Sequence, residues 1–202
     1  MKPLELETPH GPARAHLEMD DDARGLLVLG HGAGGGIGAR DLLAVARVAR
    51  SEALAVALVE QPYKVAGRRS PAPAAHLDAA WEAVVTSLSA GELRGLPLIA
   101  GGRSSGARVA CRTAAATGVV GILCLAFPVH APGRPEKSRQ AELDAVSVPV
   151  LVVQGASDPF GMPTAGPARS VAVVPGNHSL SGDLAAVESA VARWLGVVLP
   201  RR

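Results

Sequence analysis

The sequence predicts an α/β fold with a mostly parallel central sheet and helices on both faces. Its short apolar runs lack polar alternation, which is typical of strands that are buried on both faces. Stretches with helical spacing lie between these runs, and strands that alternate with helices form parallel sheets through right-handed crossovers. The predicted strands are residues 26–29, 55–59, 96–100, 119–127, 148–154 and 170–174. The predicted helices are residues 40–51, 73–89, 104–117, 139–146 and 181–195.

A further strand is expected near the amino terminus, over residues 13–19. Its polar side chains, among them His16 and Glu18, alternate with apolar ones as they do in an exposed edge strand. We therefore expect a mixed sheet rather than a wholly parallel one. Residues 61–73 and 128–139 are rich in proline and charge, and we expect them to be surface loops beside a cleft.

Length and composition indicate one compact domain that spans residues 1–202. The chain has 202 residues, of which 48% are hydrophobic and 19% charged, and this is enough apolar material for a buried core. No apolar run reaches the ~18 residues of a membrane-spanning helix, and charged residues interrupt the segment where a signal peptide would lie. We therefore expect a cytoplasmic protein that does not enter a membrane.

The charge balance argues against a nucleic-acid partner. Lys and Arg total 20 and Asp and Glu total 18, so the net charge of +2 creates no strong field for phosphate groups. Two Trp, one Tyr and two Phe are too few for a base-stacking platform. Cys111 and Cys124 lie in apolar segments without metal-ligand spacing, so we interpret them as buried hydrophobic residues. A small-molecule substrate and a monomer or small homo-oligomer are expected instead.

The strongest chemical signal follows the predicted strand 96–100. Gly102, Ser104 and Gly106 form a Gly-x-Ser-x-Gly motif between this strand and the next predicted helix. Such a turn presents the serine hydroxyl at the edge of the sheet, and the glycines remove β-carbons that would clash there. The start of the helix also supplies N–H groups beside the reacting oxygen. The motif therefore predicts a nucleophile at Ser104.

A serine nucleophile needs a histidine base, which a carboxylate orients. In sheets with this turn the chain order is serine, acid, histidine, which leaves His130 and His178 as candidates. No Asp or Glu lies between Ser104 and His130, so His130 breaks the order. His178 lies in a turn directly after the predicted strand 170–174. We therefore predict His178 as the base.

Two aspartates, Asp144 and Asp158, lie between the serine and this histidine. Asp144 falls in a predicted helix, where we expect it to face solvent. Asp158 follows the predicted strand 148–154, in a turn at the carboxyl end where an acid could reach His178. The sequence therefore predicts Asp158 as the third member of the site.

The glycine-rich turn after the predicted strand 26–29 is expected to complete the site. An oxyanion hole uses backbone N–H groups that point at the charge that develops during acyl transfer. The N–H group of Ala33 in this turn and that of Ser105, directly after the nucleophile, are the predicted donors.

The same turn also supports a different class of function. Gly30, Gly32 and Gly35 match the dinucleotide fingerprint of a Rossmann-type oxidoreductase, with Glu60 as the acid that would bind a ribose. That hypothesis accounts for one turn. It gives no reason for the turns that carry the serine, the aspartate and the histidine.

Together these turns resemble the α/β-hydrolase superfamily, and within it the small, nearly lid-less serine hydrolases related to dienelactone hydrolase. The elbow of that group reads Gly-Gly-Lys-Ser-x-Gly-Gly-Arg, and residues 101–108 are similar to it, with Arg103 in place of the lysine and Ala107 in place of the last glycine. The segments 31–35, 127–133, 154–161 and 176–179 also resemble that group. The resemblance implies the α/β-hydrolase fold, a triad of Ser104, Asp158 and His178, and no cofactor. Dienelactone hydrolases themselves use a cysteine nucleophile, so their lactone substrate is not transferred.

We therefore predict a serine hydrolase that cleaves small carboxylic esters, or amides or thioesters, through an acyl-enzyme at Ser104. A Rossmann-type dinucleotide-binding oxidoreductase and a hydrolase-fold protein that binds without catalysis are the alternatives. Arg103 and Arg108 flank the serine, and we interpret them as structural rather than substrate-binding residues. His31 is interpreted as an organiser of its turn.

Overall fold

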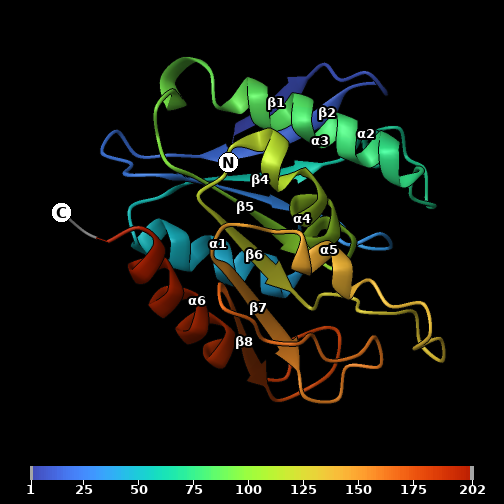
Figure 1. Ribbon diagram of the computed structural model, residues 1–202. Helices are drawn as coiled ribbons and strands as arrows, with labels where there is room; N and C mark the ends of the chain where they lie inside the picture. Colours follow the sequence, from blue (N-terminus) through green and yellow to red (C-terminus); the bar gives the residue numbers. More distant parts are fainter. Residues whose placement is uncertain (1, 201–202) are drawn as a thin grey trace.

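The computed structural model describes residues 2–200, and in them an eight-stranded mixed sheet forms the centre of the molecule (Figure 1). The strands are β1 (Lys2–Leu6), β2 (Ala13–Glu18), β3 (Leu26–Gly30), β4 (Ala55–Glu60), β5 (Leu98–Arg103), β6 (Gly121–Leu125), β7 (Val150–Gly155) and β8 (Arg169–Val174). Their order across the sheet is β1-β2-β4-β3-β5-β6-β7-β8. The six strands from β3 to β8 run parallel to one another. In contrast, β1 pairs with β2, and β2 with β4, in the antiparallel sense.

Helices cover both faces of this sheet. They are α1 (Arg40–Ser51), α2 (Pro62–Val65), α3 (Ala74–Leu88), α4 (Ser105–Thr117), α5 (Gln140–Asp144) and α6 (Leu184–Val198), with a short 3₁₀ helix at Gly91–Leu93. Figure 1 shows α1 and α6 together on one face and α3 and α4 on the other. The predicted α/β architecture with two covered faces is therefore confirmed.

Neighbouring residues of one strand belong to opposite faces of the core. Leu27 packs with the core on the side of α1 and α6, whereas Val28 packs on the side of α3 and α4. Both side chains are buried, because successive side chains of a strand point to opposite faces and helices cover each face. This explains why the strands read as continuous apolar runs.

The amino-terminal part of the sheet differs from the prediction. The segment 13–18 is not the edge strand, because β1 pairs with it on one side and β4 on the other. The ring of His16 lies 2.9 Å from a carboxylate oxygen of Glu60 on β4, so its polar character reflects a contact across strands rather than exposure at an edge. In β1 itself Pro3 and Glu5 are exposed while Leu4 is half-buried, which is the pattern of the true edge.

Smaller differences concern the loops. The expected loop 61–73 contains the short helix α2, which begins at Pro62, where proline suits the first helical position. The expected helix 139–146 is the five-residue α5. Within residues 2–200, no helix has the length and the apolar character that crossing a membrane would require.

The parallel strands end at one edge of the sheet, and the arrowheads of β5, β6 and β7 point the same way in Figure 1. The turns after β3, β5, β7 and β8 therefore meet there. These are the turns in which the sequence places the candidate site residues.

Candidate active site

Ser104 occupies a strained turn between β5 and α4. Its backbone has φ 53° and ψ −107°, a conformation that residues other than glycine rarely adopt. Such a residue costs about 1 to 3 kcal/mol and persists where the surrounding structure determines it. Here the Ser104 N–H group donates to the carbonyl oxygen of Leu125 at 2.9 Å, and α4 begins at the next residue.

The glycines on either side of the serine are required by close backbone packing. A β-carbon at Gly102 would lie 2.4 Å from the carbonyl oxygen of Gly30, and one at Gly106 would lie 2.4 Å from the same oxygen. β3 and the start of α4 therefore approach each other more closely than any residue with a side chain allows. The contact between the serine turn and β3 therefore requires both glycines of the motif.

His178 bridges Ser104 and Asp158. Its Nε2 atom lies 3.0 Å from the Ser104 hydroxyl oxygen, and its Nδ1 atom lies 2.9 Å from Oδ2 of Asp158. The carboxylate can only accept, so Nδ1 carries the proton and Nε2 is left to accept from the serine. Two hydrogen bonds through His178 thus link the three residues that the sequence predicts as a triad.

Asp158 is held in a closed environment. Its side chain is 0% exposed, whereas that of His178 is 18% exposed. Oδ1 accepts from the Phe160 N–H group at 2.9 Å, and Oδ2 also accepts from Nε2 of Gln154 at 2.9 Å. These donors satisfy a buried carboxylate that would otherwise be unfavourable.

The aspartate turn and the histidine turn pack on each other. A β-carbon at Gly155 would lie 2.4 Å from the carbonyl oxygen of Asn177, so only glycine allows this approach. The Ser157 N–H group donates to the carbonyl oxygen of Gly176 at 3.0 Å. The ring of Phe160 stacks on that of His178, with 4.1 Å between centroids. The orientation of the imidazole is therefore fixed from two sides.

The turn after β3 lies against the serine. A β-carbon at Gly32 would be 3.7 Å from that of Ser104. The Tyr63 hydroxyl donates to the carbonyl oxygen of Ala33 at 3.1 Å, and burial raises the pKa of Tyr63 to about 12, which keeps this donor protonated. Ser105 is the first residue of α4, where backbone N–H groups have no partner inside the helix. Both predicted oxyanion donors thus belong to segments beside the hydroxyl.

His31 organises this turn, as the sequence suggests. It is buried, its Nδ1 atom lies 2.8 Å from the carbonyl oxygen of Gly32, and its Nε2 atom accepts from the Gln61 N–H group at 3.3 Å. Burial lowers the pKa of His31, against an opposing effect of the hydrogen bond to Gly32. The neutral ring therefore links the turn after β3 to the turn after β4.

The geometry agrees with the comparisons with known proteins. The sequence model of the alpha/beta hydrolase domain matches residues 23–180, which is most of the chain. The chain belongs to the alpha/beta hydrolase family.

Solved structures of other hydrolases share the fold of this alpha/beta hydrolase over nearly the whole chain. A serine hydrolase without a lid from Xanthomonas campestris has 21% identity and a TM-score of 0.81, covering 100% of this chain and 96% of its own. A dienelactone hydrolase from Anabaena variabilis has 18% identity and a TM-score of 0.77, covering 98% of this chain and 97% of its own. An esterase from Pyrococcus furiosus has 13% identity and a TM-score of 0.78, covering 98% of this chain and 92% of its own.

The dinucleotide hypothesis does not fit the fold of this alpha/beta hydrolase. The fingerprint needs its glycines to open a helix whose N-terminus binds the pyrophosphate, but α1 begins only at Arg40, after an intervening loop. Glu60, the candidate ribose acid, is engaged by His16 at 2.9 Å and lies 3.7 Å from a nitrogen of Arg14. Gly30 and Gly32 serve the contact with the serine turn instead.

The two arginines beside the serine have protein partners. Arg103 donates through Nε to Oδ2 of Asp41 at 2.9 Å and through a terminal nitrogen to the carbonyl oxygen of His178 at 3.0 Å. Asp41 is buried, and burial raises its pKa while Arg103 opposes the rise. Arg108 donates to both carboxylate oxygens of Glu142 on α5. These are the contacts of structural arginines, and Arg103 anchors the histidine turn.

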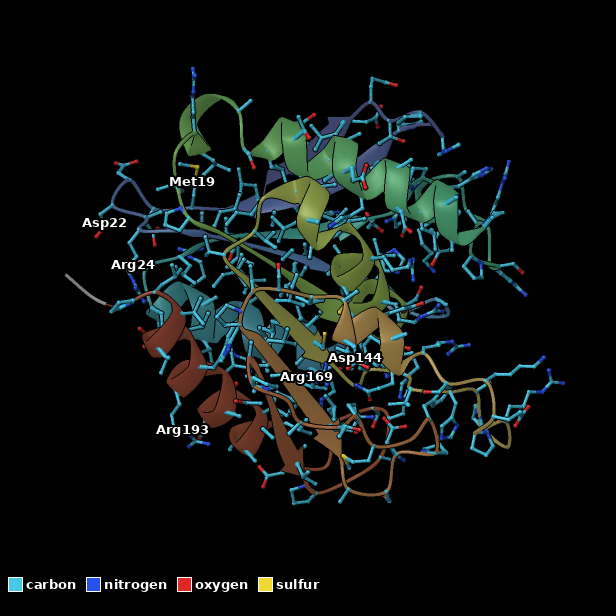
Figure 2. The ribbon with its side chains drawn as sticks, viewed as in Figure 1. Met19, Asp22, Arg24, Asp144, Arg169 and Arg193 are labelled. Atoms are coloured by element: carbon cyan, nitrogen blue, oxygen red, sulfur yellow. The ribbon has the colours of Figure 1, made fainter. Side chains whose placement is uncertain are left out.

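The rejected candidates lie outside this cluster. Asp144 is exposed on α5 and pairs with Arg169 at 2.8 Å, and Figure 2 shows the two side chains together. The Nδ1 atom of His130 lies at hydrogen-bond distance, 2.9 Å, from the carbonyl oxygen of Ala131. Cys111 and Cys124 are buried with 3.5 Å between their sulfur atoms, which agrees with their interpretation as small core residues.

Sequence reasoning missed two residues that shape the site of this hydrolase. Gln154 is fully buried at the end of β7, and its Nε2 atom donates to Asp158 and to the carbonyl oxygen of Gly161 at 2.8 Å. A single amide in an otherwise apolar strand was the available signal. Phe160, which stacks on His178, is one of five aromatic residues in the chain and lies two positions after the acid.

Proposed function

We propose that the protein is a serine hydrolase that cleaves small carboxylic esters through an acyl-enzyme at Ser104. The observation that carries the proposal is the chain of hydrogen bonds from Asp158 through His178 to Ser104, which lies on a strained turn between β5 and α4. A serine alone is a weak nucleophile, and this arrangement supplies a base that is already oriented.

In the first step, Nε2 of His178 takes the hydroxyl proton while Oγ of Ser104 attacks the carbonyl carbon of the ester. Asp158 stabilises the imidazolium that forms, and it holds the tautomer in which Nε2 is the acceptor. The carbonyl oxygen becomes an oxyanion, which the N–H groups of Ala33 and Ser105 would stabilise. Removing one such donor typically costs about 3 to 4 kcal/mol of activation free energy.

In the next steps, the imidazolium gives its proton to the departing alcohol, and the acyl group remains on Ser104. A water molecule then loses a proton to His178 and attacks the acyl carbon. The acid product leaves, the proton returns to Ser104, and the enzyme is restored. Thioesters and amides would follow the same steps, and apart from the attacking water molecule every acid, base and nucleophile needed comes from the chain.

The loops favour a small substrate. β6 ends at Leu125 and α5 begins at Gln140, so the segment between them is too short for a separate lid domain. The Xanthomonas hydrolase of the same fold is itself described as having no lid. We therefore propose an open site for short acyl groups.

Labelling with a fluorophosphonate probe tests the proposal against its alternatives. An adduct on Ser104, located by mass spectrometry and absent from Ser104→Ala, is expected. No adduct, or an adduct on another residue, would favour a hydrolase fold that binds without catalysis. A rise in melting temperature with NAD but not with esters would favour the dinucleotide-binding alternative.

A further inference from the structure

A cavity of about 510 Å³ lies at the carboxyl edge of the sheet, beyond β4. The turn between β1 and β2 forms one wall with His10 and Pro12, and the segment after β4 forms the other wall. Sites for small molecules usually enclose about 300 to 1,000 Å³. None of the three triad residues lines this cavity, so it is a candidate second site.

The lining changes from polar to apolar with depth. His10, Arg68 and His76 are exposed and form the rim. Tyr63 and Leu77 are buried and form the inner wall. A ligand that fits this gradient has a polar end at the rim and an apolar body inside.

The rim suits an anion. No carboxylate side chain lines the cavity, and Arg68 has no carboxylate partner within residues 2–200. In contrast, Arg103 and Arg108 are each paired with an acid. A free guanidinium at the mouth of a cavity can bind a carboxylate through two parallel hydrogen bonds.

The rings around the cavity suit an aromatic body. The imidazoles of His10 and His76 stack with 3.9 Å between centroids and 12° between planes, although they come from the β1–β2 turn and from α3. Tyr63 adds a third ring to the lining. Aromatic ligands gain from offset stacking and edge contacts with such rings beyond the burial of area.

Gln61 is a fixed part of the inner wall. Gln61 is 6% exposed, and its Nε2 atom donates to the carbonyl oxygen of Leu77 at 3.1 Å. Its Oε1 atom is buried and has no hydrogen-bond partner in the part of the chain that the structure describes. Because this oxygen is closed off even to water, it does not reach a ligand, and Gln61 serves as a fixed part of the wall.

We propose that this cavity binds an aromatic carboxylate, with the carboxylate on Arg68 at the rim and the ring between the His10–His76 pair and Tyr63. The ligand would also contact Tyr63, which holds the turn that contains Ala33. The site does not depend on the proposed catalysis, since its residues are separate from Ser104.

Isothermal titration calorimetry with p-hydroxyphenylpropanoate tests the proposal. Saturable binding of one ligand is expected for the full chain and equally for Ser104→Ala, which separates this site from the catalytic proposal. The uncharged p-hydroxyphenylpropanamide should bind about tenfold more weakly, because it lacks the charge-assisted bonds.

Variants locate the site. Arg68→Gln should weaken binding of p-hydroxyphenylpropanoate about tenfold, whereas Arg69→Gln, the exposed neighbour that does not line the cavity, should leave it unchanged. Ala72→Trp fills the cavity and should abolish binding without lowering the melting temperature. The proposal would be overturned by equal affinities for the acid and its amide, by equal losses at positions 68 and 69, by binding that survives Ala72→Trp, or by no saturable binding.

Discussion

Gly106 packs on Gly30 so closely that a β-carbon at position 106 would lie 2.4 Å from the Gly30 carbonyl oxygen. The contact joins the first turn of α4 to the end of β3. It therefore sets the separation between the serine turn and the turn that carries Ala33. The last glycine of the Gly-x-Ser-x-Gly motif is thus a packing requirement between two elements.

Gly106→Ala should destabilise the fold, because the contact is with backbone that cannot move aside. Overpacking of this kind typically costs about 1 to 3 kcal/mol, or more where the backbone must shift. Gly196→Ala is the control: Gly196 is exposed in α6, a β-carbon there meets nothing within 4 Å, and alanine should stabilise the helix by about 1 kcal/mol. Unfolding in urea measures both effects. A Gly106→Ala variant as stable as the parent would show that the contact is looser than described.

The sequence predicted those parts of the fold whose residues are buried on both faces of the sheet. Strands such as β3 and β6 are apolar runs in the sequence because helices cover both faces of the sheet. Likewise, α1 begins and ends where the helical spacing of apolar residues begins and ends in the sequence. β1 escaped detection because a short edge strand buries only part of one face. The polar character of His16, which by itself indicates an edge strand, reflects the contact with Glu60 across strands.

The candidate site could be predicted as far as chain order and strand ends determine it. Serine, acid and histidine each follow an apolar run, so their meeting at one edge is a consequence of parallel topology. The contact of Gln154 with Asp158 is of a different kind, and so is that of Arg103 with Asp41. They depend on distances between side chains that no sequence spacing specifies.

Asp158→Asn should lower turnover of p-nitrophenyl acetate by roughly 10⁴-fold while leaving the fold intact. The amide cannot stabilise the imidazolium, and it favours the tautomer in which Nε2 is protonated. Asp144→Asn is the matched control, since Asp144 is exposed on α5 and pairs only with groups outside the site. It should leave turnover unchanged. Equal losses from the two substitutions would show that Asp158 is not the acid.

The pH profile of acyl transfer should have an acid limb, along which activity is lost as His178 is protonated. A protonated imidazole at position 178 cannot accept the Ser104 proton, because both of its nitrogens are then donors. The pH dependence of kcat/KM for p-nitrophenyl acetate measures this limb. His178→Ala should lose both the activity and the limb. Retention of the parent turnover with the same acid limb would exclude His178 as the base.

Folding stability should depend on pH through His31. Burial lowers the pKa of His31 from 6.5, so the unfolded chain binds this proton at a higher pH than the folded chain does. The corresponding stabilisation is present above pH 6.5 and is lost as the pH falls below it. The melting temperature should therefore drop less for His31→Asn than for the parent between about pH 7.5 and 5.5. His10→Asn, at an exposed position, should keep the parent slope, and the same slope in all three proteins would rule out His31 as a source.

Short acyl chains should be the better substrates. The segments that flank the site are α2 with its following loop and the residues between β6 and α5, and neither is long enough to enclose an alkyl chain. Preference for long chains requires burial at ~0.8 kcal/mol per methylene, and an open site with few aromatic residues offers little apolar wall for it. We expect higher kcat/KM for p-nitrophenyl acetate and butyrate than for the decanoate and palmitate. A series that peaks at the decanoate or beyond would contradict this prediction, because it would require an apolar channel beside Ser104.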